Sequence, residues 1–241
     1  MHHLTLEEWS RGTSLLHARD ARAKILVLLS YLVAVNTTPS LSAPAALAYG
    51  ALAAGTIGLA GLPATGVLLR AAVVMPFTAV FAGTVLLAGD GARAWALLVR
   101  SYLSAVAVLV LAGTTPLPRL LRGLGALGVP RFLTLVVQFL YRYLFLLSEQ
   151  AQHMKLAAAS RGAAPGRWRS RRLGFRAAAG ALTVLFARSH ARAQAVHRAM
   201  LARGFGGSIP ALAHEDFRPA DAVFLAGGVA LCAAARLALG M

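Results

Sequence analysis

The sequence predicts an all-α integral membrane protein with about five transmembrane helices and two long cytoplasmic helices. First, 58% of the 241 residues are hydrophobic and only 13% are charged, whereas about 25% of residues are charged in ordinary soluble proteins. Second, several apolar runs approach the roughly 17 to 25 residues that a helix needs to cross a bilayer. Third, these runs are much longer than the roughly 10-residue alternating segments of a membrane β-barrel.

Five apolar runs are candidates for the transmembrane helices. They cover residues 25–35, 41–69, 71–89, 101–117 and 219–235. The first run is short and follows a polar N-terminus, so we expect it to be an uncleaved anchor rather than a signal peptide. Pro76 lies within the third run and should kink that helix, because proline removes a backbone donor and clashes with the preceding turn.

The distribution of charge predicts the orientation in a bacterial plasma (inner) membrane. Arg19, Arg22 and Lys24 precede the first run, and basic residues mark the cytoplasmic side, so the N-terminus should be cytoplasmic. With five spans the C-terminus would lie outside, and Arg236 near that end does not fit this orientation.

A basic block lies between Gln150 and His214, where the sequence has Lys155 and ten arginines but no Asp or Glu. Because these residues alternate with alanine and leucine between spans, they indicate a cytoplasmic surface facing anionic lipid headgroups. The net charge of +16 is therefore not interpreted as a sign of nucleic-acid binding.

The chain accordingly divides into four regions. These are a cytoplasmic N-terminal segment (1–24), a four-helix transmembrane region (25–117), a cytoplasmic region (118–214) and a C-terminal transmembrane helix (215–241). The third region contains two long helical stretches, 131–161 and 173–203, each of which changes from apolar to basic along its length. Arg142 in the middle of the first stretch makes a simple span costly. We therefore expect both stretches to be amphipathic helices on the cytoplasmic face.

Both long stretches end in a small residue, an arginine and a glycine. The two tips are Ser160, Arg161 and Gly162, and Ala202, Arg203 and Gly204. An arginine is favourable at the negative end of the helix dipole, and a following glycine allows the left-handed turn that directs its side chain outward. Such a guanidinium can pair with a carboxylate of a partner. The alternative is that each arginine only caps its own helix.

The paired tips resemble the Ala-Arg-Gly signature of the transmembrane T component of energy-coupling factor (ECF) transporters. Segments 17–39, 118–150 and 199–205 resemble the cobalt/nickel, CbiQ-like branch of that family. The resemblance extends from about residue 10 to residue 238. Ser160 is a departure, because the family usually has alanine at that position.

The resemblance implies a coupling scaffold without cofactor or enzymatic activity. Two cytoplasmic ABC ATPases would bind the tips at Arg161 and Arg203, and a separate membrane subunit would bind the substrate, Co²⁺ or Ni²⁺. The aromatic stripe of Tyr141, Tyr143, Leu144 and Phe145 would face that subunit or lipid, although ordinary helix packing is an alternative. A substrate subunit for a vitamin such as biotin or thiamine remains open.

Other classes of protein are less consistent with the sequence. An enzyme would need clustered ionisable groups, but the acids are mostly scattered, and no HExxH, DxxxD or Walker A motif occurs. We expect Asp20 to cap the helix that begins near Ala21, and Glu149 to pair with His153 or an arginine.

His190 and His197 share a helical face, but they provide too few ligands for a metal site, and the single cysteine, Cys232, excludes a Cys-rich one. A self-contained carrier would need polar groups within the spans. A membrane anchor for an unrelated partner is the remaining alternative.

Overall fold

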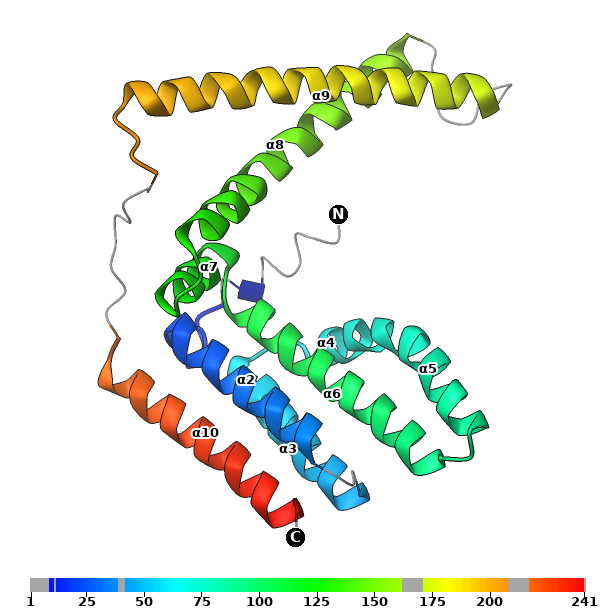
Figure 1. The fold of residues 1–241 in the computed structure, drawn as a ribbon, viewed down its shortest axis with the longest axis vertical. Helices are drawn as coiled ribbons and strands as arrows, with labels where there is room; N and C mark the ends of the chain where they lie inside the picture. Colours follow the sequence, from blue (N-terminus) through cyan, green and yellow to red (C-terminus); the bar gives the residue numbers. More distant parts are fainter. Residues whose placement is uncertain (1–8, 11, 39–41, 162–170, 208–216, 241) are drawn as a thin grey trace. The chain divides into compact units, whose positions relative to one another are not determined.

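A computed structural model describes residues 9–10, 12–38, 42–161, 171–207 and 217–240. Within these residues the regular secondary structure is helical (Figure 1). The chain forms two compact units. Unit 1 comprises residues 1–128 and 213–241, and unit 2 comprises residues 129–212.

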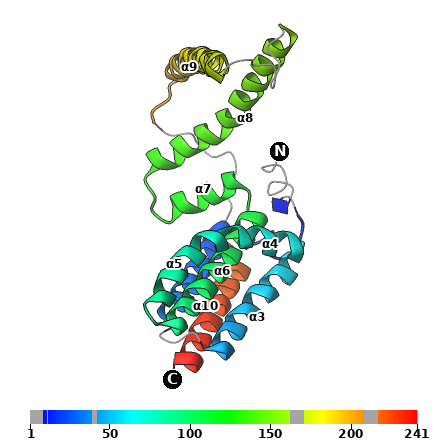
Figure 2. The same ribbon diagram turned by 90° about the vertical axis from the view of Figure 1, so that its right-hand side faces the viewer.

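Unit 1 is a bundle of helices. Its helices are α2 (Ala21–Thr37), α3 (Ala43–Ala60), α4 (Ala64–Ala71), α5 (Met75–Leu87), α6 (Gly91–Thr114), α7 (Leu117–Ala126) and α10 (Pro219–Gly240). In Figures 1 and 2, α2, α3, α6 and α10 run side by side. The helices α2 and α6 run in opposite directions, because Lys24 near the start of α2 contacts Thr114 at the end of α6.

Two apolar clusters form the core of unit 1. One lies between α3, α4 and α6 and includes Ile57, Val67 and Val106, while Trp9 packs against its edge. The other joins α2, α3, α6 and α10, and includes Tyr49 and Cys232. The second cluster contains residues from both ends of the sequence, because Cys232 of α10 packs with residues of α2, α3 and α6. This part of the core is therefore complete only when α10 has packed against the earlier helices.

The structure confirms an all-α membrane protein that crosses the bilayer several times. Five described helical segments are long and apolar enough to span: Ala43–Ala60, Ala64–Leu87, Gly91–Thr114, Arg131–Ser160 and Pro219–Ala238. Helix α2, which contains the expected first span, has 17 residues and is shorter than each of these. The segment Arg131–Ser160 qualifies by length and composition, although its sequence predicts an amphipathic helix on the cytoplasmic face.

Two local expectations about helix ends are confirmed. The side chain of Asp20 caps α2, since its Oδ1 accepts a hydrogen bond from the Arg22 N–H at 2.8 Å. The expected disturbance at Pro76 also occurs: α4 ends at Ala71, a 3-10 turn covers Ala72–Val74, and α5 begins at Met75 with the proline in its first turn. Proline is tolerated there because the first N–H groups of a helix have no partner within it.

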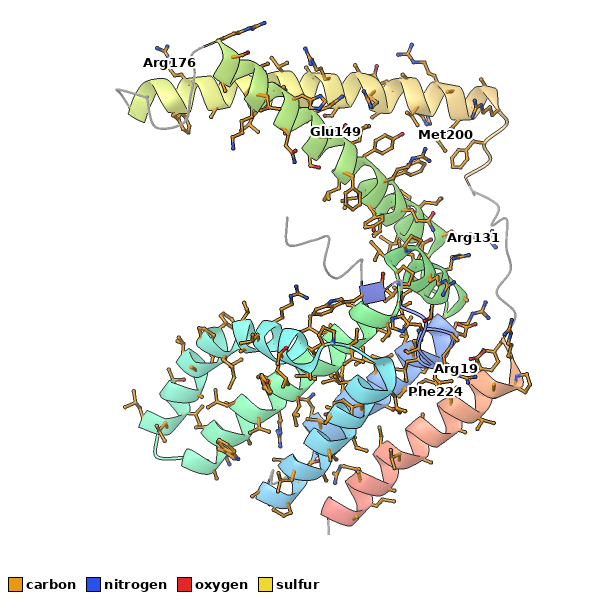
Figure 3. The ribbon with its side chains drawn as sticks, turned by 180° about the vertical axis from the view of Figure 1, so that it is seen from behind. Arg19, Arg131, Glu149, Arg176, Met200 and Phe224 are labelled. Atoms are coloured by element: carbon orange, nitrogen blue, oxygen red, sulfur yellow. The ribbon has the colours of Figure 1, made fainter. Side chains whose placement is uncertain are left out.

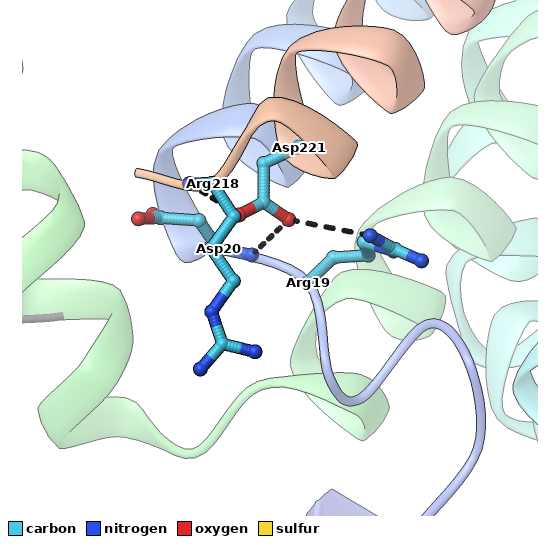
Figure 4. Close-up of polar contacts among 4 residues, drawn as sticks. All are labelled: Arg19, Asp20, Arg218 and Asp221. Carbon is cyan, nitrogen blue, oxygen red and sulfur yellow. Dashed lines mark hydrogen bonds and ion pairs between the residues drawn. The ribbon is translucent and has the colours of Figure 1, made fainter. Parts of the chain in front are cut away.

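Buried polar contacts tie together three helix ends at one end of unit 1, which we call the Lys24 end. Asp221 in the first turn of α10 accepts hydrogen bonds from the backbone N–H groups of Asp20 at 3.2 Å and Arg218 at 3.1 Å, and the Arg19 guanidinium lies 3.8 Å from its carboxylate (Figure 4). Lys24 Nζ donates to the Thr114 carbonyl at 3.1 Å. The starts of α2 and α10 and the end of α6 therefore share this end.

Two arginines hold the carboxyl end of α2 at the opposite end of unit 1. Arg236 of α10 donates through its Nη2 to the Thr37 carbonyl at 2.9 Å, and Arg100 of α6 donates to the Thr38 carbonyl. The last carbonyls of a helix lack intrahelical partners and carry partial negative charge. Arg236, which did not fit the predicted orientation, therefore has a structural partner within the bundle.

The described part of unit 2 contains two long helices, α8 (Arg131–Ser160) and α9 (Arg171–Ala202). Their bounds agree with the expected stretches 131–161 and 173–203 to within two residues. The two helices cross each other in Figure 1, and their carboxyl ends lie on different sides of the crossing. Helix α8 has 30 residues and α9 has 32, so each is about 45 to 50 Å long.

Candidate docking site at the ends of α8 and α9

The end of α9 is a Schellman turn. The N–H of Phe205 donates to the Met200 carbonyl at 3.0 Å, and the N–H of Gly204 donates to the Leu201 carbonyl at 2.9 Å. Gly204 has a φ of 77°, which lies in the left-handed region that favours glycine. The expected left-handed turn after Arg203 is thus confirmed, and the chain reverses direction immediately after the arginine.

Arg203 is the C-cap residue of this turn, and its side chain is exposed, as is that of Ala202 before it. The carbonyls of Met200 and Leu201 in the last turn of α9 are occupied by backbone N–H groups of the turn itself. The guanidinium is therefore not required to cap the helix. Because the preceding residue is alanine, no bulky side chain stands between the guanidinium and an approaching surface.

The end of α8 presents the second arginine. Ser160 is the last helical residue, and its hydroxyl donates to the Ala157 carbonyl at 2.9 Å. Arg161 follows as the C-cap residue with φ −87° and ψ 13°, and it is exposed. Gly162 lies outside the described residues. The hydroxyl of Ser160 is directed back onto its own helix, so the serine presents little more surface than an alanine would.

Neither tip arginine is neutralised by a described residue of the unit. Among the described residues, the ion pairs are Arg19 with Asp221 and Arg93 with Asp90, and neither Arg161 nor Arg203 takes part. An exposed guanidinium without a carboxylate partner retains its five donors for an external acceptor. The two tips are thus a pair of cationic surfaces, one at the end of each crossing helix.

A groove of about 490 Å³ lies between α8 and α9. Its walls are mostly apolar and aromatic: Phe139, Leu140, Tyr143 and Leu147 come from α8, and Phe186, Ser189, His190, Arg192, Ala193, Val196, His197, Met200 and Phe205 come from α9 and the turn after it. Figure 3 shows Met200 in the last turn of α9 and Glu149 on α8. Met200 and Phe205 belong both to the Schellman turn and to the wall of the groove. The turn that carries Arg203 therefore forms one end of the groove.

The structure divides the aromatic stripe of α8 between two faces. Tyr143 stacks on Phe139 with the ring centroids 6.3 Å apart, and both line the groove. Tyr141 packs edge-to-face on Phe145 at 5.1 Å, and Phe145 and Leu144 are exposed. Contact with a second membrane subunit therefore remains a prediction for the exposed pair, whereas Tyr143 faces α9.

Two further sequence expectations concern charged side chains in unit 2. Glu149 is exposed and forms no ion pair with the described residues, so the expected pairing with His153 or an arginine is wrong; the neighbours available on α8 extend into solvent instead. His190 stacks on Phe186 and contacts Gln194 at 3.0 Å. In the described part of the chain, no group of three His, Cys, Asp or Glu side chains could hold a metal ion.

Sequence reasoning identified the tips but not the groove. The groove depends on which residues of α8 face α9, and the sequence of either helix alone does not contain that information. A signal was present in Phe205, an apolar residue three positions after the last helical residue of a strongly basic helix. A hydrophobic residue at that position commonly accompanies a Schellman turn.

Comparison with known families gives one match. Residues 12–212 match the family described as CbiQ, cobalt transport protein. No curated protein matches the chain.

Proposed function

The chain belongs to the CbiQ family of cobalt transport proteins, and on this premise we propose that it is the transmembrane coupling subunit of an ECF-type importer. In this role two cytoplasmic ABC ATPases bind the α8 and α9 tips, and a separate membrane subunit binds the substrate, Co²⁺ or Ni²⁺. The proposal is carried by one observation: both long helices of unit 2 end in an exposed arginine that forms no ion pair among the described residues.

We propose further that α8 does not cross the membrane, although it is apolar enough to do so. Helix α10 begins at the same end of unit 1 at which α6 ends, since the contacts of Asp221 and Lys24 bring both helix ends to the start of α2. The chain must therefore cross the membrane an even number of times between α6 and α10. Helix α9 is not among the candidate spans, so a single crossing by α8 would put α10 on the wrong side.

The charge of α8 supports the same conclusion. Arg142 is exposed in the middle of the helix, and an unpaired arginine at the centre of a bilayer costs about 2.5 kcal/mol or more. The spans are then α2, α3, α4 with α5, α6, and α10. On this assignment neither helix of unit 2 spans the membrane.

The Lys24 end is proposed to be cytoplasmic. Arg19, Arg22, Lys24 and Arg218 lie there at the starts of α2 and α10, and positive residues are retained on the cytoplasmic side during insertion. At the opposite end, Arg100 and Arg236 are engaged with the carboxyl end of α2. The N-terminus and unit 2 are thus assigned to the cytoplasm, where ATPases are available.

The proposed coupling mechanism follows from the form of unit 2. Each tip is fixed to a rigid helix about 45 to 50 Å long, and the two helices contact each other across the groove. When ATP binding draws two attached ATPases together, the tips must move toward each other, and the angle at the crossing must change. Such a change reaches any subunit that rests on the exposed faces of α8 or α9, including the surface at Leu144 and Phe145.

The test is purification of the tagged chain in detergent from its native membrane, followed by identification of the proteins that co-purify. We expect two ABC ATPase chains with the wild type and none with the double variant Arg161→Glu/Arg203→Glu. The control Arg188→Glu makes the charge change of one tip substitution at an exposed position of α9 far from its carboxyl end. Retention of the ATPases by the double variant, or loss with Arg188→Glu alone, would contradict docking at the tips.

The same experiment separates the substrate classes. A co-purifying membrane subunit with metal-ligating side chains would support Co²⁺ or Ni²⁺, and uptake of ⁵⁷Co²⁺ or ⁶³Ni²⁺ into cells would then depend on Arg203. A vitamin-binding subunit would indicate instead a T component for a substrate of the biotin or thiamine type.

A further inference from the structure

Unit 1 contains a half-open cavity of about 360 Å³ that the coupling role does not use. Four helices line it: α2, α3, α6 and α10. The lining residues of α2 extend from Lys24 to Tyr31, and those of α10 from Val223 to Cys232. The cavity, which we call the α3–α10 slot, is therefore elongated along the helix axes over about two turns.

The slot opens sideways, between α3 and α10. Its inner wall is buried and includes Ala53, Val110 and Cys232. Its exposed lining residues are Leu59 on α3 and Val223, Gly227 and Leu231 on α10. Because α3 and α10 are both candidate membrane spans, the mouth of the slot faces the hydrocarbon of the bilayer.

The polar groups of the wall are already satisfied within the protein. The hydroxyl of Thr56 donates to the Ala53 carbonyl at 2.7 Å, that of Thr114 donates to the Val110 carbonyl at 2.9 Å, and that of Tyr31 donates to the Tyr49 carbonyl at 3.1 Å. Water needs two to four polar partners to occupy a buried site, and a hydrated cation needs more. The chemistry of the wall therefore selects an apolar occupant.

One end of the slot is cationic. Lys24 lines that end, and the Arg19 and Arg218 side chains lie beside the start of α10, which also carries the slot residue Phe224 (Figures 3 and 4). The side chain of Arg218 is exposed. An occupant with an apolar tail and an anionic head matches this polarity, because the tail fills the slot and the head meets the arginines at the membrane surface.

We propose that the α3–α10 slot binds one acyl chain of an anionic phospholipid, whose headgroup lies at the Lys24 end of unit 1. A cavity of this size left empty would forfeit the packing contacts of its lining, and the bilayer supplies the apolar chain directly at the mouth. The lipid would bridge α3 and α10, which otherwise have few direct contacts along the slot. This inference does not depend on the coupling role of unit 2.

The structure provides a position at which a side chain can be added to the slot without a clash at its Cβ. Gly227 lines the slot, and a Cβ added to it would meet nothing within 4 Å. Gly83 on α5 is also free of neighbours within 4 Å and does not line the slot. Gly227→Leu and Gly83→Leu are therefore a matched pair, in which the same side chain is added inside and outside the proposed site.

The experiment is native mass spectrometry of the full-length chain in detergent with added phosphatidylglycerol. We expect the wild type and Gly83→Leu to retain one phosphatidylglycerol molecule, and Gly227→Leu to lose it. Phosphatidylcholine with the same acyl chains should be retained more weakly, and Arg218→Gln should weaken phosphatidylglycerol retention by about fivefold, since one surface arginine contributes on this order to anionic-lipid binding. Equal retention by Gly227→Leu and the wild type would overturn the proposal, as would the absence of retained lipid in the wild type.

A second measurement needs no variant. Cys232 is the single cysteine of the chain and lies on the inner wall of the slot, so its alkylation by N-ethylmaleimide reports on occupancy. We expect added phosphatidylglycerol to slow the alkylation of delipidated protein severalfold, and phosphatidylcholine to slow it less. An alkylation rate that is independent of phosphatidylglycerol would refute the inference.

Discussion

Replacement of Gly204 by alanine tests the turn that positions Arg203. Gly204 has a φ of 77°, and an L-residue in the left-handed region costs roughly 1 to 2 kcal/mol relative to its usual conformations. A Cβ at this position would meet nothing within 4 Å, so the whole effect comes from the backbone. A cost of 1 to 2 kcal/mol changes an equilibrium constant by about 5- to 30-fold, and we expect the turn to open more often by that factor.

Hydrogen exchange measures this opening directly. The amides of Gly204 and Phe205 donate to the carbonyls of Leu201 and Met200 only while the turn is closed. In Gly204→Ala their exchange rates should therefore rise about 5- to 30-fold, while amides in the middle of α9 keep the wild-type rate. The assay is hydrogen–deuterium exchange of the full-length chain in nanodiscs, followed by mass spectrometry of the peptide that contains the turn.

Two further variants test whether the positive φ of Gly204 causes the faster exchange. Gly206 does not have a positive φ and also has open space around its Cβ position, so Gly206→Ala should leave exchange unchanged. Asparagine tolerates the left-handed region better than alanine does, and Gly204→Asn should give an intermediate rate. Unchanged exchange in Gly204→Ala, or equal acceleration in Gly206→Ala, would refute the assignment of a strained turn at Gly204.

Three stability predictions concern unit 1, and each is checked by the midpoint of thermal unfolding in detergent. Gly228→Ala should destabilise the bundle by about 1 to 3 kcal/mol, because the added Cβ would lie 2.8 Å from a methyl of Val27. The control Gly227→Ala should leave the midpoint unchanged, because its added Cβ would meet nothing within 4 Å. Equal midpoints for the two variants would contradict the close approach of α10 to α2. Lys24→Met should lower the free energy of unfolding by about 1 to 3 kcal/mol, because the Thr114 carbonyl loses its buried donor. An unfolding midpoint equal to that of the wild type would contradict a stabilising role for this hydrogen bond. Tyr49→Phe should lower the free energy of unfolding by about 1 kcal/mol, because the buried contact between the Tyr49 and Thr38 hydroxyls is lost. An unchanged midpoint would indicate that this contact does not contribute to stability.

The features that the sequence predicted correctly depend on local chemistry. The cap at Asp20, the interruption before Pro76 and the left-handed turn at Gly204 each involve residues within one helical turn of each other. The all-helical membrane architecture follows from composition and from the length of the apolar runs. The bounds of the two long helices of unit 2 were also predictable, because small and turn-forming residues follow each of them.

The features that the sequence did not reveal depend on distant residues. Asp221 contacts the start of α2 across 201 positions, and Arg236 contacts Thr37 across 199. No periodicity links such pairs. From the sequence alone, Arg236 is for that reason interpreted as a charge that marks one side of the membrane. In the structure it donates to the carboxyl end of α2. The slot and the groove likewise arise from the spacing between helices, which neither composition nor amphipathicity determines.

The contacts at the two ends of α2 have a mechanical consequence. Asp221 and Lys24 fix its first turn to α10 and α6, while Arg236 and Arg100 fix its last residues to the same two helices. Any sliding of α2 along either neighbour would stretch hydrogen bonds at both ends simultaneously. These three helices therefore resist shear as one stiff body.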